Sequence, residues 1–103
     1  MSKKVLLFFA NGTEEVEALV PCDFLRRSGC EVTLCGVGTK EKILSGSHGI
    51  KVECDCLETQ LNKDESYDLV VVPGGLKGAN TLSNSEYVEY FLAKAQMAIL
   101  KWS

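Results

Sequence analysis

Two apolar runs, each ended by a turn, constrain the fold of this sequence more than any other feature. Residues 5–10 read Val-Leu-Leu-Phe-Phe-Ala and stop at Asn11, and residues 67–72 end in Leu-Val-Val-Val before Pro73. A strand with one face in water alternates apolar and polar side chains, whereas a strand covered on both faces is apolar throughout. The two runs therefore predict central strands of a parallel sheet that helices cover on both sides.

A helix is predicted directly after the first run. It begins after Thr13, whose hydroxyl can cap its N-terminus, and ends at Gly29. Glu14 and Glu15 are interpreted as solvated side chains that interact favourably with the helix dipole. The apolar residues that recur at helical spacing are Val16, Leu19, Val20 and Phe24. This stripe is expected to face the sheet.

The remaining patterns complete an alternation of strands and helices. Residues 31–37 predict a second strand, and residues 43–54 predict a small hairpin around a Ser-Gly-Ser-His-Gly loop. A last helix begins at Ser83 with a capping box that ends at Glu86. Residues 97–100 either extend this helix or start another strand, because both patterns fit. The order of the elements indicates a right-handed α/β sandwich whose sites lie at the carboxyl ends of the strands.

Length and charge limit the class of protein. The 103 residues fit a single domain, residues 1–103, with a modest core. The net charge of −3, from 11 basic and 14 acidic residues, disfavours nucleic acid as a partner. The N-terminal apolar run is too short to cross a membrane and no small-residue cleavage site follows it, so no membrane association is expected. We expect a cytoplasmic protein.

The five cysteines are odd in number and have no regular spacing, which predicts reduced thiols rather than a disulfide framework. Cys54 and Cys56 are separated by one residue, so on a strand their side chains would share a face, with His48 nearby. A four-ligand zinc site normally shows a second pair of ligands, which this sequence lacks. We interpret the cysteines as packing residues and expect neither a metal nor another cofactor.

Unusual residues follow two strands of the predicted sheet. Residues 11–17 follow the first strand and residues 73–80 form a loop after the strand at 67–72, so the two segments would be neighbours at one edge. The backbone N–H groups of Gly74 and Gly75 could stabilise an oxyanion or bind a carboxylate, but a Pro-Gly-Gly turn is also a common structural stop. Glu17 lies beside the apolar stripe. A partly buried carboxyl group there would stay protonated and donate a hydrogen bond to a thiolate.

Other chemistries fit the sequence less well. A phosphate or flavin bound after Thr13 would face the three glutamates of the first helical turns, and neither a Gly-x-Gly-x-x-Gly nor a Walker pattern is present. Catalysis by a serine, a histidine and an aspartate has no supporting motif. His48, the only histidine, is interpreted as a surface residue in a turn without a visible partner.

Several motifs together resemble the ThiJ/PfpI family of glyoxalases and protein deglycases. They are the Asn-Gly-Thr-Glu-Glu-Val-Glu segment at 11–17, Pro21-x-Asp23, the Arg-Arg-Ser-Gly helix end at 26–29, and the strand at 67–72 with its Pro-Gly-Gly turn. The resemblance covers the chain to about Lys94. The glutamate run and the Pro-Gly-Gly strand end, at this separation, are more specific together than either is alone.

The resemblance implies a flavodoxin-like sandwich of the class I glutamine-amidotransferase type, which forms a homodimer. It implies that Glu17 hydrogen-bonds a reactive cysteine and that Gly75, beside Gly74, contributes to an oxyanion pocket. The predicted binding residues near the pocket or the dimer interface are Asn11, Asp23, Arg27 and His48. The substrates that it implies are small aldehydes such as methylglyoxal or glycated proteins, and the family also includes chaperones and sensors of oxidative stress.

One departure from the family concerns the nucleophile. The reactive cysteine of the family follows a strand that should come after the helix at 86–95, but here residues 96–103 read Gln-Met-Ala-Ile-Leu-Lys-Trp-Ser. We therefore expect a truncated sheet without the C-terminal catalytic half, and no turnover by this chain alone. Two hypotheses follow. The chain is the N-terminal portion of such an enzyme, or it is a non-catalytic dimerisation or chaperone-like module.

Overall fold

The chain folds into strands and helices, and the two apolar runs form strands as predicted. The computed structural model describes residues 3–95 and 98–100. The strands are β1 (Lys4–Ala10), β2 (Glu31–Val37), β3 (Ile43–Ser45), β4 (Lys51–Glu53), β5 (Cys56–Leu57), β6 (Leu69–Val72) and β7 (Ala98–Leu100). The helices are α1 (Glu15–Arg27), α2 (Leu76–Ser83) and α3 (Glu86–Lys94), and η1 (Glu58–Gln60) is a short 3₁₀ turn.

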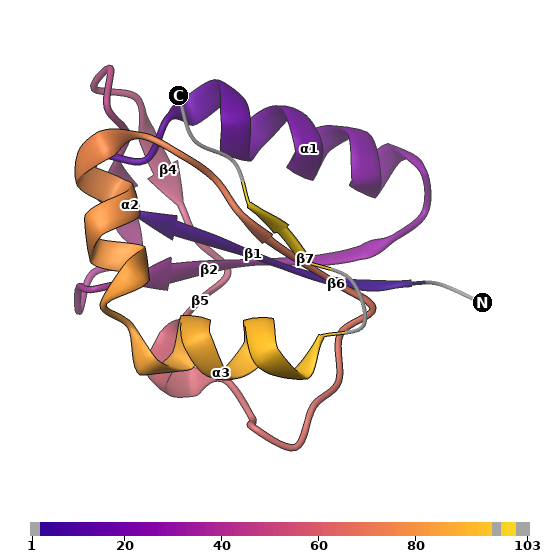
Figure 1. Cartoon of the computed structure of the whole chain (residues 1–103). Helices are drawn as coiled ribbons and strands as arrows, with labels where there is room; N and C mark the ends of the chain where they lie inside the picture. The colour runs from indigo at the N-terminus through magenta and orange to yellow at the C-terminus, as the bar shows by residue number, and fades with distance from the viewer. Residues whose placement is uncertain (1–2, 96–97, 101–103) are drawn as a thin grey trace.

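Five of the strands form one parallel sheet with β1 at its centre (Figure 1). The order across the sheet is β5-β2-β1-β6-β7. β1 pairs with β2 from Lys4 opposite Glu31 to Ala10 opposite Val37, and with β6 on its other side. β7 pairs with β6, so residues 98–100 form a strand rather than an extension of the helix. The antiparallel pair β3 and β4 is the predicted hairpin, and the predicted α/β class is confirmed.

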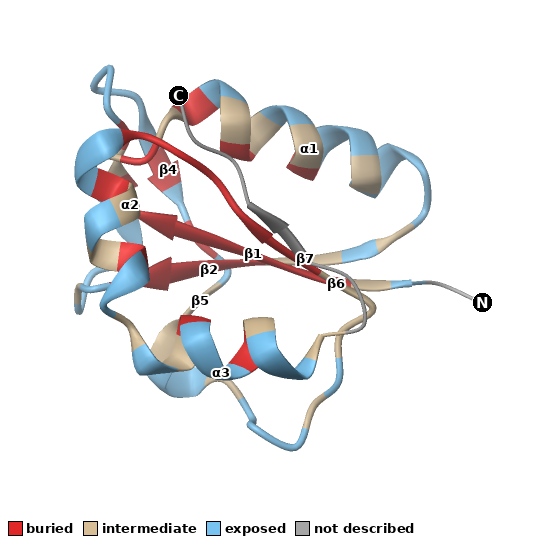
Figure 2. Cartoon of the chain, in the orientation of Figure 1, coloured by how far each residue is buried: buried red, intermediate tan, exposed pale blue. Residues whose placement is uncertain are grey.

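The two faces of the sheet carry separate hydrophobic cores, because alternate side chains of β1 point in opposite directions. The residues on the side of α1 and the β3–β4 hairpin are Val5, Leu7 and Phe9, and those on the side of α2 and α3 are Leu6, Phe8 and Ala10. All six are buried, and Figure 2 shows β1 as a buried strand between the helices. Burial on both faces is the reason that this strand is apolar throughout.

Helix α1 buries a different face from the one that the sequence predicts. Three residues of the predicted stripe are exposed to solvent: Val16 by 64%, Val20 by 59% and Phe24 by 65%. Ala18 and Cys22 face the sheet instead, and of the predicted stripe only Leu19 packs partly against the core. Small side chains allow the helix to approach the sheet closely, whereas periodicity does not say which apolar face the sheet covers.

The predicted helix caps are displaced by one or two residues. Glu14 caps α1 through a hydrogen bond from a backbone N–H of the first turn (3.0 Å), whereas the Thr13 hydroxyl accepts one from the N–H of Ala10 (2.9 Å). Ser85 rather than Ser83 caps α3. Neighbouring residues of capping type give the same sequence pattern, so the turn that leads into each helix decides which of them is used.

Residues 76–83 form α2, so the prediction of a loop over 73–80 is wrong. Only Gly78 and Leu82 of this helix are buried, and it therefore lacks the apolar stripe that would reveal it in the sequence. α2 lies beside the carboxyl end of β1 (Figure 1), which brings it to the candidate site. In the part of the chain that the structure describes, no helix is both long and apolar enough to cross a membrane.

The two leucines of α2 provide a test of this packing. Leu82 is 1% exposed, and truncating a buried leucine to alanine costs about 2–5 kcal/mol of stability. Leu76 is 93% exposed, so Leu76→Ala is expected to change stability by no more than about 0.5 kcal/mol. Urea unfolding followed by circular dichroism measures both. Equal losses for the two variants would contradict the orientation of α2.

Candidate functional site

The segments that follow β1 and β6 lie against each other at the carboxyl edge of the sheet. The N–H of Glu14 donates to the carbonyl oxygen of Gly74 (2.9 Å). In return, the N–H of Gly74 donates to Oε1 of Glu17 (2.9 Å). The structure therefore brings together Glu17 and the Pro-Gly-Gly turn, which are 57 residues apart in the sequence.

Gly75 is required by the close packing of these two segments. Its φ of +104° is a conformation that side chains other than glycine rarely adopt. A Cβ atom at Gly75 would also lie 2.6 Å from the backbone nitrogen of Glu14 and 2.7 Å from the carbonyl oxygen of Gly12. Gly75 is the N-cap of α2, and the first N–H groups of a helix have no partners within it. The turn therefore places backbone donors at the same edge as the Glu17 carboxyl group.

Glu17 is half-buried, as predicted, but for a different reason, because most of the apolar stripe beside it faces solvent and its carboxyl group lies against the Pro-Gly-Gly turn. It acts as an acceptor in its bond to Gly74, and within the described residues no other hydrogen bond of its side chain is present. The second carboxyl oxygen can therefore interact with another group at this edge. The expectation that Glu17 is protonated and donates to a thiolate is not tested by this contact and stays a prediction.

Glu15 is the most deeply buried acid of the segment, so its interpretation as a solvated side chain is wrong. It is 2% exposed, and its carboxylate lies against the loop of the β3–β4 hairpin. The backbone N–H groups of His48 (2.9 Å) and Ile50 (3.1 Å) donate to it, and so does the Ser47 hydroxyl (3.3 Å). These bonds join the start of α1 to a loop more than 30 residues away.

The hydrogen bonds keep Glu15 charged. Burial raises the pKa of a carboxyl group, but here the backbone donors of Glu15 itself, Ile50 and His48, with the His48 side chain, outweigh it and lower the pKa of Glu15 to about 2. Gly46 makes room for this arrangement, because a Cβ atom there would lie only 2.3 Å from the carboxyl carbon of Glu15. Glu15 therefore acts as a structural anchor for the hairpin.

The sequence holds one weak signal for this anchor. A loop that reads Ser-Gly-Ser-His-Gly carries several backbone N–H groups that no strand can satisfy, and buried donors need acceptors. The loop thus indicates that an acceptor must come from elsewhere in the chain. Nothing in the sequence says which of the acids supplies it.

His48 is exposed, as predicted, but its ring lies within reach of two glutamate side chains. Its Nδ1 lies 3.2 Å from Oε1 of Glu15 and 3.4 Å from Oε2 of Glu14. These three side chains offer oxygen and nitrogen atoms within 4.8 Å of one another, a spacing that a metal ion could use. The Glu15 oxygens, however, already accept N–H and hydroxyl hydrogen bonds. The cluster is therefore explained by the anchoring of the hairpin.

Cys54 and Cys56 do not share a face, so that part of the sequence interpretation is wrong. Cys54 packs in the core on the α1 side of the sheet, whereas Cys56 packs on the α3 side. The chain bends at Asp55, between the end of β4 and the start of β5, and this bend breaks the alternation that a single strand would have imposed. His48 lies with the glutamates and not with these thiols.

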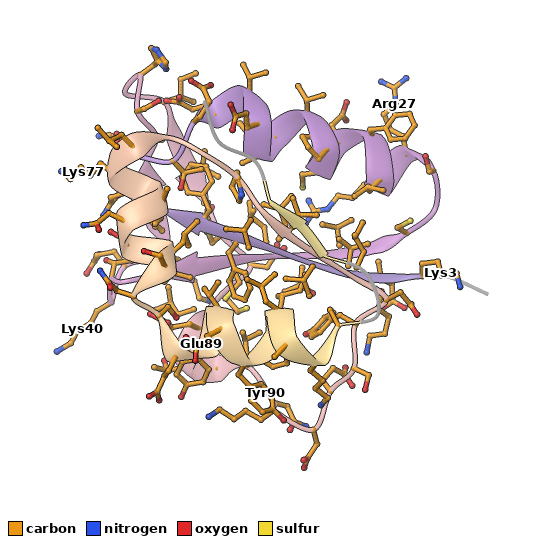
Figure 3. All side chains as sticks on the ribbon, in the orientation of Figure 1. Lys3, Arg27, Lys40, Lys77, Glu89 and Tyr90 are labelled. Atoms are coloured by element: carbon orange, nitrogen blue, oxygen red, sulfur yellow. The ribbon has the colours of Figure 1, made fainter. Side chains whose placement is uncertain are left out.

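The remaining predicted residues fall into two places. Asn11 accepts a hydrogen bond from the N–H of Ser45 (2.8 Å) and lines a hollow of about 500 Å³ at the carboxyl edge, together with Lys77 of α2. Asp23 and Arg27 pair with each other on the exposed surface of α1 (3.7 Å). Figure 3 shows Lys77 at the carboxyl edge and Arg27 at the far end of α1. The structure therefore does not bring Asp23 and Arg27 to the strand-end site.

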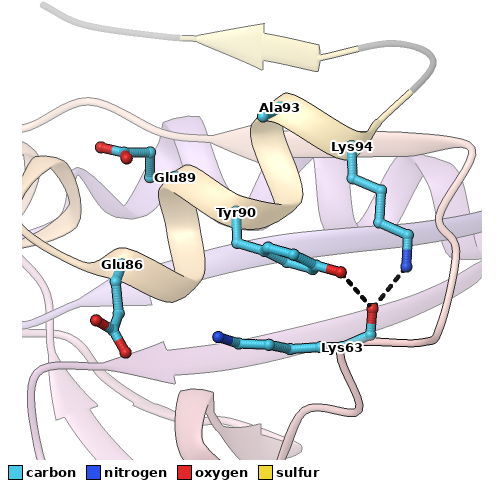
Figure 4. Close-up of a pocket in the computed structure, with 6 residues that line it drawn as sticks. All are labelled: Lys63, Glu86, Glu89, Tyr90, Ala93 and Lys94. Atoms are coloured by element: carbon cyan, nitrogen blue, oxygen red, sulfur yellow. Dashed lines mark hydrogen bonds between the residues drawn. The ribbon is translucent and has the colours of Figure 1, made fainter.

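A second hollow, of about 480 Å³, lies between α3 and the loop that precedes β6 (Figure 4). Tyr90 and Lys94, one helical turn apart, donate to the carbonyl oxygen of Lys63 at 2.9 Å and 2.6 Å. The Lys63 ammonium lies 5.2 Å from the centre of the Tyr90 ring. These contacts hold the loop onto α3. No motif in the sequence indicates this hollow.

The chain is similar to known proteins over most of its length. The model of the DJ-1/PfpI family matches residues 3–98. Protein DJ-1 homolog B of Arabidopsis thaliana is 41% identical over 93 residues, which are 90% of this chain and 21% of that protein. The glutathione-independent glyoxalase DJ-1 of Schizosaccharomyces pombe is 27% identical over 96% of this chain and 54% of its own length.

The fold is also similar to that of solved structures. Oxidized DJ-1 of Toxoplasma gondii superposes with a TM-score of 0.88 at 32% sequence identity, over 95% of this chain and 55% of that one. The chain thus spans about half, or less, of the length of the proteins that it matches. The sandwich fold implied by the sequence motifs is confirmed.

The Glu15 anchor predicts a specific dependence of stability on pH. Its pKa is about 2 in the folded chain against an ordinary value of 4.5, so the charged form stabilises the fold above pH 4.5 and this contribution is lost as the pH falls from 4.5 toward 2. Glu15→Gln should lower the urea midpoint at pH 7, and the difference from wild type should shrink below pH 4.5. Urea unfolding at several pH values measures it.

The exposed Glu41 provides a matched control for this experiment. Glu41→Gln is expected to leave the midpoint nearly unchanged at pH 7. A Glu15→Gln variant as stable as wild type at pH 7, or a difference that grows toward pH 3, would contradict the anchoring role.

Proposed function

The chain belongs to the DJ-1/PfpI family, as its motifs indicate, and we propose that Glu17 and the Pro-Gly-Gly turn form part of a site for a small aldehyde of the glyoxalase type. The observation that carries this proposal is the 2.9 Å hydrogen bond between Oε1 of Glu17 and the N–H of Gly74. It fixes a carboxyl group beside backbone donors at the carboxyl edge of the sheet, where α/β proteins bind their ligands. A relative in Schizosaccharomyces pombe is named a glutathione-independent glyoxalase.

The geometry supports a division of chemical roles at this edge. When a thiolate adds to an aldehyde carbon, the carbonyl oxygen takes up the negative charge. Backbone N–H groups at the start of α2, around Gly75, are suited to stabilise that oxygen. The other carboxyl oxygen of Glu17 can form a hydrogen bond with the thiol before the thiol attacks the aldehyde. A glycated protein is an alternative substrate, because glycation is the addition of an aldehyde to a protein side chain.

The thiol that this chemistry needs is not provided at the site by the described residues. Cys22 and Cys54 are buried in the core on the α1 side, and burial raises the pKa of both thiols, that of Cys54 to about 12. Cys35 is buried within β2, and Cys30 directly precedes that strand at the opposite edge of the sheet. Cys56 lies on the edge strand β5 and packs on the α3 side. We therefore propose that a polypeptide of these 103 residues alone does not turn over substrate.

A methylglyoxal assay tests this proposal. The 103-residue polypeptide should consume methylglyoxal at the uncatalysed rate, because none of its cysteines lies at the site between Glu17 and Gly75 to supply a thiolate. Lactate formation is followed with time, and Glu17→Gln is measured beside the wild-type polypeptide. Turnover above background that Glu17→Gln lowers by tenfold or more would contradict the proposed inactivity.

We further propose that the chain forms a homodimer through the exposed face of α1. Val16, Val20 and Phe24 follow one another at intervals of four residues and form an apolar stripe in contact with solvent. The ion pair between Asp23 and Arg27 lies along the same side of the helix, at the polar border that interfaces commonly have. This observation also supports the second candidate function, a non-catalytic dimerisation or chaperone-like module.

The five cysteines bear on the location of the protein. All of them are free thiols in the structure. Free thiols persist in reducing compartments, so we propose a cytoplasmic location.

A charge placed within the α1 stripe should disrupt the dimer. Val20→Asp is expected to shift the chain from dimer to monomer, with at least a tenfold weaker association, because an aspartate would be buried without a partner. Leu76→Asp provides a matched control, since Leu76 is exposed but lies on α2. Sedimentation velocity over a range of concentrations measures both. A monomeric wild type, or dissociation by Leu76→Asp alone, would contradict the α1 interface.

A further inference from the structure

Cys35 and Cys56 lie opposite each other on neighbouring strands, away from the candidate site. Cys35 of β2 is in register with Cys56 of the edge strand β5. Side chains in register on adjacent strands point to the same face of a sheet, and both residues belong to the core on the α3 side. Neighbouring strands are about 4.7–4.9 Å apart, and disulfides join residues whose Cα atoms are about 4.4–6.8 Å apart.

Cys54 is excluded from this pair by its position. A Cβ atom at Gly36 would lie 3.5 Å from Sγ of Cys54, so Cys54 is on the side that Gly36 faces. Cys35 is the preceding residue of the same strand and therefore faces the opposite side. Cys54 consequently serves as a matched control, since it is two residues from Cys56 in the sequence but on the other face of the sheet.

Polar contacts hold β5 in place on both sides of Cys56. The Asp55 carboxylate accepts hydrogen bonds from the N–H of Leu34 (2.8 Å) and from the guanidinium of Arg26 (2.8 Å). On the other side, the Glu58 carboxylate accepts one from the N–H of Gly38 (2.8 Å). The register between Cys35 and Cys56 is therefore fixed from both ends, although β5 has only two residues.

The two thiols differ in exposure and in acidity. Cys35 is completely buried, whereas Cys56 is partly exposed on the edge strand. In the structure the Cys35 thiol donates a hydrogen bond of 3.8 Å to the carbonyl oxygen of Gly36. Because Cys56 lies opposite it, hydrogen bonding from the Cys35 thiol lowers the pKa of Cys56 against the opposing effects of burial and of Asp55. The neighbouring Cys56 sulfur, followed by burial, raises the pKa of Cys35. Cys56 is thus the thiol that a peroxide can reach and that more readily forms a thiolate.

We propose that Cys35 and Cys56 form a second reactive site, a dithiol that hydrogen peroxide oxidises to a disulfide between β2 and β5. The Cys56 thiolate attacks one peroxide oxygen, the O–O bond breaks, and the hydroxide that leaves takes a proton to form water. The sulfur of Cys35 then attacks the sulfenic sulfur of Cys56. The S–S bond forms, the S–O bond breaks, and the hydroxyl group leaves with the Cys35 proton as a second water molecule.

The order of these steps follows from the structure. Cys35 cannot react first, because no solvent reaches it. Once Cys56 is a sulfenic acid, its sulfur is no longer anionic, so one cause of the raised pKa of Cys35 is removed while burial remains. Cys35 acts as the resolving thiol because it lies opposite Cys56 on the neighbouring strand. A thiol donor reverses the reaction by exchange. This site is independent of the aldehyde site, since it uses neither Glu17 nor the Pro-Gly-Gly turn.

Peptide mapping of the wild-type chain tests the proposal. The folded chain is treated with equimolar hydrogen peroxide, and free thiols are alkylated in denaturant. Cleavage after Leu34 and before Asp55 then separates Cys35 from Cys30 and Cys56 from Cys54. A cross-linked peptide pair that contains Cys35 and Cys56 and disappears after reduction is expected. Cys56 recovered as a sulfinic acid with Cys35 still alkylated, or Cys35 linked to Cys54, would overturn the proposal.

Two variants distinguish the pair from random oxidation. Cys56→Ala should abolish the cross-link and leave Cys35 free, whereas Cys54→Ala should retain the cross-link at wild-type yield. Circular dichroism shows whether each variant is folded. If Cys54→Ala is unfolded, wild-type chain oxidised in urea replaces it. In urea the yield of the Cys35–Cys56 cross-link should fall at least fivefold, because disulfides with Cys22 and Cys30 form instead. An unchanged yield would overturn the proposal.

Discussion

The burial of β1 on both faces is the constraint on which the rest of this structure depends. β1 pairs with β2 on one side and β6 on the other, and its side chains supply the centre of both cores. A strand in that position must end at an edge of the sheet where its neighbours end too. The segment from Asn11 to Glu17 therefore meets the Pro-Gly-Gly turn through backbone hydrogen bonds, and the candidate site is a consequence of the parallel sheet.

Two acids of the same helical turn have separate tasks. Glu15 is buried and its charge is stabilised by donors from the hairpin loop, which keeps the hairpin against α1. Glu17 lies two residues later, so it points about 200° around the helix and reaches Gly74. A buried carboxylate without donors would strongly destabilise the fold. The hairpin is therefore needed for the helix that carries Glu17 to keep its position.

The aldehyde site and the thiol pair use different parts of the sheet. The first is built at the ends of β1 and β6, and the second lies across β2 and the edge strand β5. Each arises because parallel strands bring distant residues side by side. A chemical change at Cys56 would reach the site only through the sheet and its hydrogen bonds, since no residue is common to both.

The sequence by itself determined the central strands β1 and β6, the class of fold and the approach of Glu17 to the Pro-Gly-Gly turn, because continuous apolar runs and the turns that end strands are local properties. It did not determine that Glu15 rather than Glu14 is buried, because the donors that distinguish them come from a loop more than 30 residues away. It did not determine that Val16, Val20 and Phe24 face solvent. Only the tertiary structure decided which apolar face meets the sheet and which cysteines meet each other, because these choices depend on how distant segments pack.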